Sequence, residues 1–183
     1  MSFQDNTVRP FTLLALAASA IGAGALVGAT TNAINGIVSP EYFQIVMRWG
    51  DVEHTWRTIL AQGIFEGLIY GIIFSVIFTL VIGVVTKGRC TYLVALKYMT
   101  AIISGVYFCW IVGGVVGLGL AWLSPEFYQR TFYRVPVQYS EMFRYAWVGG
   151  SIWGALAGSV LACVIGLVLF AVRWRENMKS VRG

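Results

Sequence analysis

Four long apolar runs dominate the chain, separated by short polar connections. They cover residues 11–38, 58–86, 93–123 and 145–172. About 20 helical residues cross the hydrocarbon core of a bilayer, so each run is long enough to span it. The runs are rich in Leu, Ile, Val, Gly and Ala and do not alternate polar with apolar residues, which favours helices over barrel strands. The pattern predicts an all-α membrane protein with four transmembrane helices.

A seven-residue phrase occurs twice along the chain. Val38–Gln44 reads Val-Ser-Pro-Glu-Tyr-Phe-Gln, and Leu123–Gln129, 85 positions later, reads Leu-Ser-Pro-Glu-Phe-Tyr-Gln. Each copy follows one apolar run and precedes another. The recurrence predicts a tandem repeat of a two-helix hairpin, over residues 1–90 and 91–183. Each copy holds two spans, so both enter the membrane from the same side and the repeat is parallel.

The repeated phrase has the features of a helix start. Serine suits the N-cap, proline suits the first helical position, and glutamate suits the first turn, where the helix dipole favours negative charge. The residues concerned are Ser39, Pro40, Glu41, Ser124, Pro125 and Glu126. Aromatic residues follow both copies, as is typical of the membrane–water boundary. We expect two short amphipathic interfacial helices on the outer side, the second carrying a Glu126–Arg130–Arg134 ladder.

Glycines four residues apart mark the second span of each half. They are Gly63, Gly67 and Gly71 and, 87 positions later, Gly150, Gly154 and Gly158. Such a stripe lets another helix backbone approach closely. It predicts tight packing between helices, and an interface between copies of the chain is compatible with it.

Composition and charge agree with a membrane protein. Charged residues make up 11% of the chain, against about 25% in soluble domains. The lysines and arginines divide eight to five between the two sides: Arg9, Lys87, Arg89, Lys97, Arg173, Arg175, Lys179 and Arg182 against Arg48, Arg57, Arg130, Arg134 and Arg144. The positive-inside rule then predicts two cytoplasmic termini. A basic rim facing anionic lipid accounts for the net charge of +5 without a nucleic-acid partner.

The two halves differ in a few polar positions near the outer ends of their spans. Asn32 and Asn35 in the first span correspond to Gly117 and Leu120 in the third. Gln62 and Glu66 in the second span correspond to Gly149 and Trp153 in the fourth. At 1.5 Å per residue, Asn32 and Glu66 lie about 10 and 12 Å from the outer ends of their spans, so they could meet. The candidate intramembrane polar site is Thr31, Asn32, Asn35, Gln62 and Glu66.

Glu66 is the one acidic residue within the four runs. An ionisable group inside a membrane is a functional-site hypothesis, here for a proton, a cation or a polar ligand. The alternative is a hydrogen-bonded glutamate that joins two helices.

Motifs for catalysis and for metal binding are absent from the sequence. It contains no phosphate-binding loop, nucleophile elbow, zinc-protease motif or dinucleotide fingerprint. A single histidine, His54, cannot supply the paired ligands of a b-type haem, and the spacing of Cys90, Cys109 and Cys163 suggests neither a disulfide nor a metal site. We expect no enzyme activity, no metal and no cofactor.

The phrase Ile37-Val38-Ser39-Pro40-Glu41-Tyr42-Phe43 resembles one found after the first span in a group of bacterial four-span membrane proteins of no established activity. Members of that group carry a His-Asp-Gln cluster in the preceding span, where this chain has Thr31-Asn32-Ala33. The resemblance implies a bacterial membrane location, and we expect the inner membrane.

Two functions fit these features. The first is a structural or accessory membrane subunit, surrounded by lipid and packed against copies of itself or against a larger complex, because small-residue stripes and surface helices suit such a role. The second is a small oligomeric channel or transporter that uses the polar cluster around Glu66.

Overall fold

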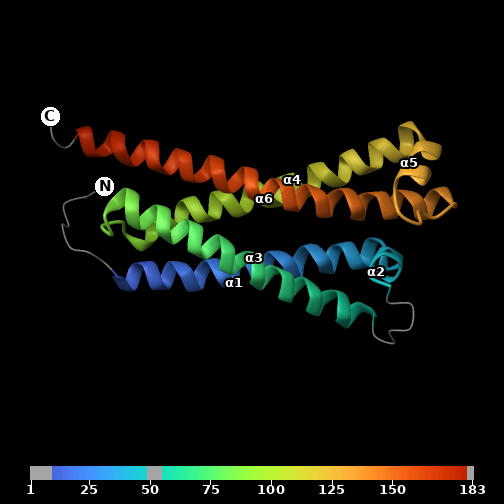
Figure 1. The fold of residues 1–183 in the computed structure, drawn as a ribbon, viewed down its shortest axis with the longest axis horizontal. Helices are drawn as coiled ribbons and strands as arrows, with labels where there is room; N and C mark the ends of the chain where they lie inside the picture. Colours follow the sequence, from blue (N-terminus) through green and yellow to red (C-terminus); the bar gives the residue numbers. More distant parts are fainter. Residues whose placement is uncertain (1–9, 49–54, 181–183) are drawn as a thin grey trace.

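The computed structural model describes residues 10–48 and 55–180. They form six helices and no strand: α1 (Pro10–Val38), α2 (Pro40–Val46), α3 (Thr55–Thr86), α4 (Tyr92–Leu123), α5 (Pro125–Thr131) and α6 (Tyr139–Ser180) (Figure 1). His54 lies outside the described residues.

Four of these helices are long and apolar enough to cross a membrane, namely α1, α3, α4 and α6. They indicate a multi-pass membrane protein and confirm the predicted all-α class with four spans. The helix α6 exceeds its predicted range of 145–172 at both ends. The added residues include Glu141, Arg175 and Lys179, which are good helix formers although they are not apolar, so the helix continues beyond its apolar run.

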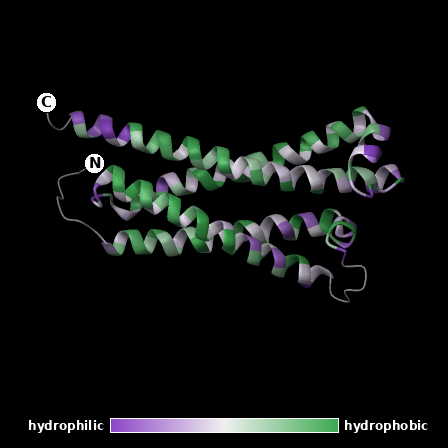
Figure 2. Cartoon of the chain, viewed as in Figure 1, coloured by the Kyte–Doolittle hydropathy of each residue, from purple (hydrophilic) through white to green (hydrophobic). Residues whose placement is uncertain are grey.

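The long helices are arranged as two crossed pairs, which we call the first pair (α1 and α3) and the second pair (α4 and α6). Contacts within each pair greatly exceed contacts between the pairs (Figure 1). Apolar residues cover the sides of all four long helices, while polar residues gather toward their ends (Figure 2). This distribution is expected where the surrounding solvent is hydrocarbon.

Backbone touches backbone where the helices of each pair cross. A Cβ atom added to Gly28 would overlap the carbonyl oxygen of Gly63, and one added to Gly67 would overlap that of Gly24. In the second pair, an added Cβ would bring Gly113 and Gly150 into the same conflict. The six predicted packing glycines, Gly63, Gly67, Gly71, Gly150, Gly154 and Gly158, therefore all lie at these crossings.

Side-chain cores lie on either side of the crossings. At the end of the bundle nearer both termini, a cluster drawn from all four long helices includes Leu16, Phe78, Met99, Phe170 and Trp174. At the other end, a second cluster joins α2 and α5 to the long helices and includes Tyr42, Phe43, Ile59, Tyr128 and Tyr145. The pairs are thus held together mainly at their ends.

The two short helices start at the repeated phrases. The Ser39 hydroxyl accepts a hydrogen bond from the backbone N–H of Tyr42 at 3.3 Å, whereas Ser124 makes no side-chain cap bond. Pro40 and Pro125 are the first residues of α2 and α5, and Glu41 and Glu126 lie in their first turns.

The aromatic residues of these helices divide between core and surface. Tyr42, Phe43 and Tyr128 are buried in protein contacts, while Phe127 and, just after α5, Tyr133 are exposed. Burial raises the pKa of Tyr42, and burial followed by the nearby Tyr42 raises that of Tyr128 to about 12, so both hydroxyls stay neutral near pH 7. The expected Glu126–Arg130–Arg134 ladder is wrong at its last member, because α5 ends at Thr131 and Arg134 has a φ of 45°.

Candidate functional site

A buried hydrogen bond joins the two pairs near the end of the bundle that carries α2 and α5. The Ser151 hydroxyl of α6 donates to Oδ1 of Asn35 in α1 at 3.1 Å, and both residues are fully buried. The Asn35 amide nitrogen has no hydrogen-bond partner among the described residues. At offsets of 85 and 87, Asn35 and Ser151 correspond to Leu120 and Ile64. These side chains cannot form a hydrogen bond, so the bond has no second copy.

Two tyrosines of α4 form the other side-chain hydrogen bonds between the pairs in the part of the chain that is described. The Tyr107 hydroxyl lies 2.6 Å from Oγ1 of Thr30, and the Tyr92 hydroxyl lies 2.8 Å from Oγ of Ser19. Sequence reasoning missed these four residues and Ser151. Their hydroxyl groups lie inside or directly beside apolar runs, and a hydroxyl away from water needs a hydrogen-bond partner. That feature of the sequence could have identified them.

Thr31 and Asn32 make their contacts inside the first pair. The Thr31 hydroxyl donates to the carbonyl of Val27 at 2.8 Å, which lies one turn earlier in α1. The Asn32 amide donates to the carbonyl of Ile59 at 3.4 Å, and its Cβ lies where a Cβ on Gly63 would stand. Asn32 therefore helps to seat α1 on α3, whereas the Thr31 hydroxyl is satisfied within α1.

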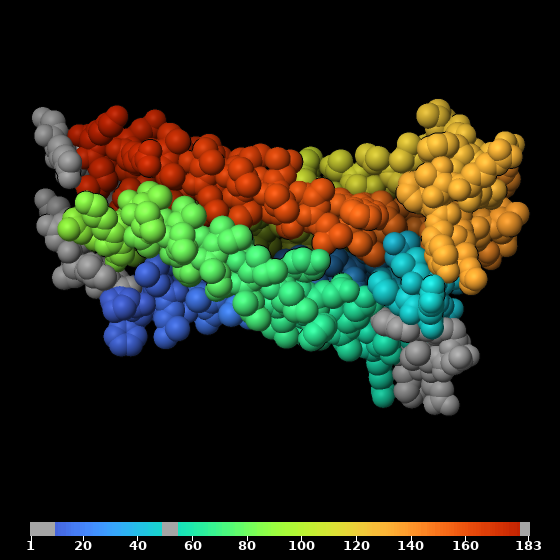
Figure 3. Space-filling model, viewed as in Figure 1, coloured from blue at the N-terminus to red at the C-terminus, as the bar shows by residue number. Residues whose placement is uncertain are grey.

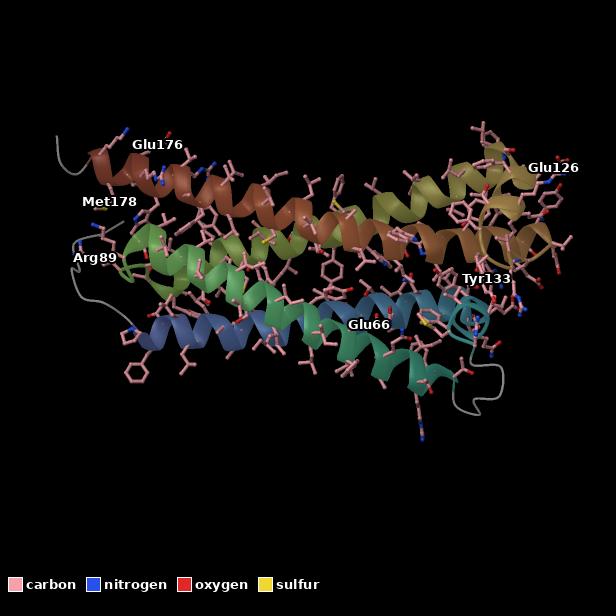
Figure 4. The ribbon with its side chains drawn as sticks, viewed as in Figure 1. Glu66, Arg89, Glu126, Tyr133, Glu176 and Met178 are labelled. Atoms are coloured by element: carbon pink, nitrogen blue, oxygen red, sulfur yellow. The ribbon has the colours of Figure 1, made fainter. Side chains whose placement is uncertain are left out.

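Gln62 and Glu66 lie beside the contact between α1 and α3 rather than in it. The Gln62 amide donates to Oε1 of Glu66 at 2.7 Å and lies 3.6 Å from the sulfur of Met47. Each residue precedes a glycine of the stripe by one position, which is 100° around the helix. Glu66 is exposed on α3 near its crossing with α1 (Figure 4). The structure does not join it to Asn32 or Asn35 by a hydrogen bond.

The exposed carboxylate lies at hydrocarbon depth. Glu66 is 11 positions after Thr55, about 16 Å along a helix of about 48 Å, and a 30 Å core centred on that helix begins about 9 Å from its start. Its exposed neighbours are apolar, including Phe65 at 64% and Ile69 at 43%. An acidic group there costs about 2.5 to 3.5 kcal/mol on insertion scales. Among residues 10–48 and 55–180, the Gln62 amide is the group that offsets this cost through a hydrogen bond.

An open hollow lies at the end of the bundle that carries α2 and α5, where the two pairs meet. It is lined by Gln44, Ile45, Arg48, Tyr133 and Arg134. Arg48 and Arg134 both adopt left-handed backbone, with φ of 60° and 45°. The Arg134 guanidinium lies 5.5 Å from the centre of the Tyr133 ring. The chain segments that follow α2 and α5 thus face one another across this hollow.

Groups suited to metal binding or nucleophilic chemistry do not gather in the described residues. No cluster of three or more His, Cys, Asp or Glu side chains occurs there. Cys90, Cys109 and Cys163 are free thiols. Cys90 is 2% exposed, and burial raises the pKa of its thiol to about 11, with a backbone hydrogen bond from Ala95 acting in the opposite direction.

No family model, no curated protein and no solved structure matches the chain.

Proposed function

We propose that this protein is a non-enzymatic integral membrane subunit, whose helix α3 packs against another membrane helix in a homo-oligomer or a larger complex. The observation that carries the proposal is the Gln62–Glu66 pair. It presents a carboxylate on a membrane-depth surface that is otherwise apolar. A covering helix that donates a hydrogen bond to Glu66 would remove this polar group from lipid.

The spacing along α3 supports a helix as the covering element. Residues separated alternately by four and three positions follow one side of a helix, and this side begins at Gln62 and Glu66 and continues through Ile69, Ile73, Val76 and Leu80. The four apolar members are 43% to 61% exposed. Heptad spacing of this kind matches a neighbouring helix that crosses at a shallow angle. In Figure 3, α3 and α6 form one face of the molecule, with part of α1 visible between them.

We also propose that the chain arose by duplication of one hairpin and that it lies in a bacterial inner membrane. The two pairs are copies of one hairpin, since the contacts Gly28–Gly63 and Gly113–Gly150 correspond at offsets of 85 and 87. The short helices α2 and α5 lie at the outer surface of a bacterial inner membrane, with both termini cytoplasmic. The exposed Phe127 and Tyr133 and the basic rim near the termini support this placement.

Photo-crosslinking in native membranes tests the docking face. A photoreactive phenylalanine analogue would replace Phe65, beside Glu66, or Phe108 on α4 as a matched control. These side chains are 64% and 67% exposed. We expect position 65 to give a discrete protein adduct and position 108 to label lipid only. Lipid labelling alone at both positions would contradict the proposal.

A small oligomeric channel or transporter is the second candidate, and one observation favours it. The buried side-chain atoms Nδ2 of Asn35 and Oε1 of Gln62 both lack hydrogen-bond partners in the part of the chain that the structure describes. Such atoms are suited to bind a water molecule or a polar solute. Proton or cation flux into vesicles holding the purified protein tests this candidate. Flux that is abolished by Glu66→Gln, with assembly unchanged, would favour it over the subunit role.

A further inference from the structure

A groove opens between α4 and α6 at the end of the bundle nearer the termini. Its volume is about 300 Å³. The lining residues from α4 are Val94, Lys97, Tyr98 and Ala101, and those from α6 are Phe170, Arg173, Trp174 and Asn177. None of them belongs to the polar positions around Glu66, so the groove is a separate feature.

Aromatic rings form one wall of this groove. Tyr98 and Phe170 meet edge to face with their centroids 5.1 Å apart, and Phe170 stacks on Trp174 at 5.9 Å. Phe170 and Trp174 are 1% and 8% exposed, so the protein core holds this wall in place. A fixed apolar surface of this kind suits a hydrocarbon chain or the glycerol region of a lipid.

Two cations stand at the groove without anionic partners. Lys97 and Arg173 are both exposed, and neither has an ion-pair partner within residues 10–48 and 55–180. Glu176, the nearest carboxylate along α6, projects away from α4 (Figure 4). The groove therefore has two positive charges beside its apolar wall, and no carboxylate among the described residues forms an ion pair with either.

The first pair lacks counterparts of the two cations of this groove. At offsets of 85 and 87, Lys97 and Arg173 correspond to Thr12 and Thr86. The helix α3 ends at Thr86, whereas α6 continues past Arg173 to Ser180. The basic groove is thus an addition to the second pair, not a consequence of the shared crossing.

We propose that this groove binds an anionic phospholipid. Its phosphate lies between Lys97 and Arg173, and its acyl chains run from the aromatic wall onto the exposed apolar sides of α4 and α6. A guanidinium forms paired hydrogen bonds to phosphate oxygens, and an ammonium adds a point charge. Basic pockets between membrane helices on the cytoplasmic side are suited to acidic lipid headgroups. The volume admits a glycerophosphate headgroup and leaves both chains in the bilayer.

Native mass spectrometry of the full chain in detergent tests the site. Phosphatidylglycerol and phosphatidylcholine with identical acyl chains would be titrated separately. We expect the wild type to retain phosphatidylglycerol preferentially. The double variant Lys97→Gln/Arg173→Gln should bind it about 30-fold more weakly, since each cation near an anionic lipid contributes about one kcal/mol. Lys97→Arg keeps the charge and should keep the lipid.

The matched control removes the same charge from the same helix end. The double variant Arg175→Gln/Lys179→Gln alters exposed residues of α6 outside the groove and should retain phosphatidylglycerol within about twofold of wild type. Equal loss in both double variants, or no loss in either, would overturn the proposal. Displacement of the lipid by glycerol phosphate at equal concentration would also overturn it, by identifying a soluble phosphate site.

Discussion

The two helix pairs share a central contact and differ in what surrounds it. Gly28 against Gly63 in the first pair matches Gly113 against Gly150 in the second. Around that contact, the first pair carries the polar residues Asn35 and Glu66, whose counterparts are Leu120 and Trp153. The residues around the crossings therefore fall into two sets. The shared glycines lie where the helices of each pair approach most closely, and the unshared polar residues lie outside that contact.

A closer view of the crossings shows where the pairs depart from one another. Gly24 in the first pair corresponds to Cys109 in the second. A Cβ on Gly24 would meet the backbone of Gly71 at 2.6 Å, whereas the Cys109 side chain occupies the space that a Cβ on Gly158 would need. The second pair therefore accepts a side chain at a level where the first pair requires glycine on both helices.

The largest expected effect comes from filling the first crossing. Gly24→Val places a branched side chain against the backbone of α3, which cannot yield without separating the helices. Overpacking a core costs about 1–3 kcal/mol, occasionally more. Here the added side chain meets the backbone of Gly67 and Gly71, which has no alternative rotamer to adopt. Thermal unfolding in detergent should show a large loss for Gly24→Val. Gly22→Val is the control, since a Cβ on Gly22 meets nothing within 4 Å. Equal losses would contradict the close crossing.

The next effect concerns Cys90, which lies between the pairs in the core near the termini. With its pKa raised from 9.0 to about 11, its thiolate fraction at pH 8 falls about 100-fold, so alkylation should be slowed at least that much. Mass spectrometry after iodoacetamide treatment, with denatured protein as reference, measures this. The rate should rise about tenfold per pH unit up to about pH 11.

The same shift has a consequence for stability. Because folding raises the pKa of the Cys90 thiol, the protonated thiol contributes stability that is fully present below pH 9.0. That contribution is lost as the pH rises toward about 11. In the alkylation experiment, rapid reaction of Cys90 in the folded protein at pH 8 would contradict its burial. It would show that the two pairs separate at the end of the bundle nearer the termini.

A smaller effect is expected at the buried bond between the pairs. A double-mutant cycle with Asn35→Ala and Ser151→Ala should give a coupling energy of about 0.6 kcal/mol, the average for hydrogen bonds between membrane helices, with about 1.7 as the upper end. Unfolding in mixed micelles measures it. Thr79→Ala replaces Asn35→Ala in the control cycle, because Thr79 bonds within α3, and should show no coupling to Ser151→Ala. Zero coupling in both cycles would remove Asn35 as a link between the pairs.

An effect of the same small size is expected at Tyr107. Tyr107→Phe removes the 2.6 Å contact with Thr30 while keeping the ring, so the loss should be about 0.6 kcal/mol. Tyr70→Phe, on the exposed side of α3, is the matched control and should change stability less. The same unfolding measurement applies. A larger loss in Tyr70→Phe would show that its hydroxyl has a partner outside this chain.

Periodicity in the sequence was enough to predict the four spans and the starts of the two short helices. Apolar runs longer than a bilayer core leave few alternatives, and the Ser-Pro-Glu phrase combines three preferences for a helix N-terminus. The packing of the glycine stripes also followed a local rule. These features depend on residues close together in the chain.

The partners of the polar residues could not be read in the same way. Asn35 and Ser151 are 116 positions apart, and their meeting depends on how one pair seats against the other. The sequence did not predict that Tyr42 is buried against the protein, because its ring lies 4.7 Å from that of Tyr145 on α6, which is distant along the chain. The sequence did contain enough information to predict that Glu66 lies outside the contact between α1 and α3. Glu66 directly precedes a packing glycine, and neighbouring residues are 100° apart around a helix.

The most direct test of the central claim, that the α3 face around Glu66 docks another membrane helix, is the size of the native complex. Wild type, Glu66→Gln and Glu66→Ala would be purified from native membranes under mild conditions, with Thr100→Val as a control on the exposed side of α4. We predict a complex larger than the monomer for wild type and Thr100→Val, retained by Glu66→Gln, which still accepts a hydrogen bond, and lost in Glu66→Ala with the monomer folded. A monomeric wild type, or a complex unchanged by Glu66→Ala, would contradict the account.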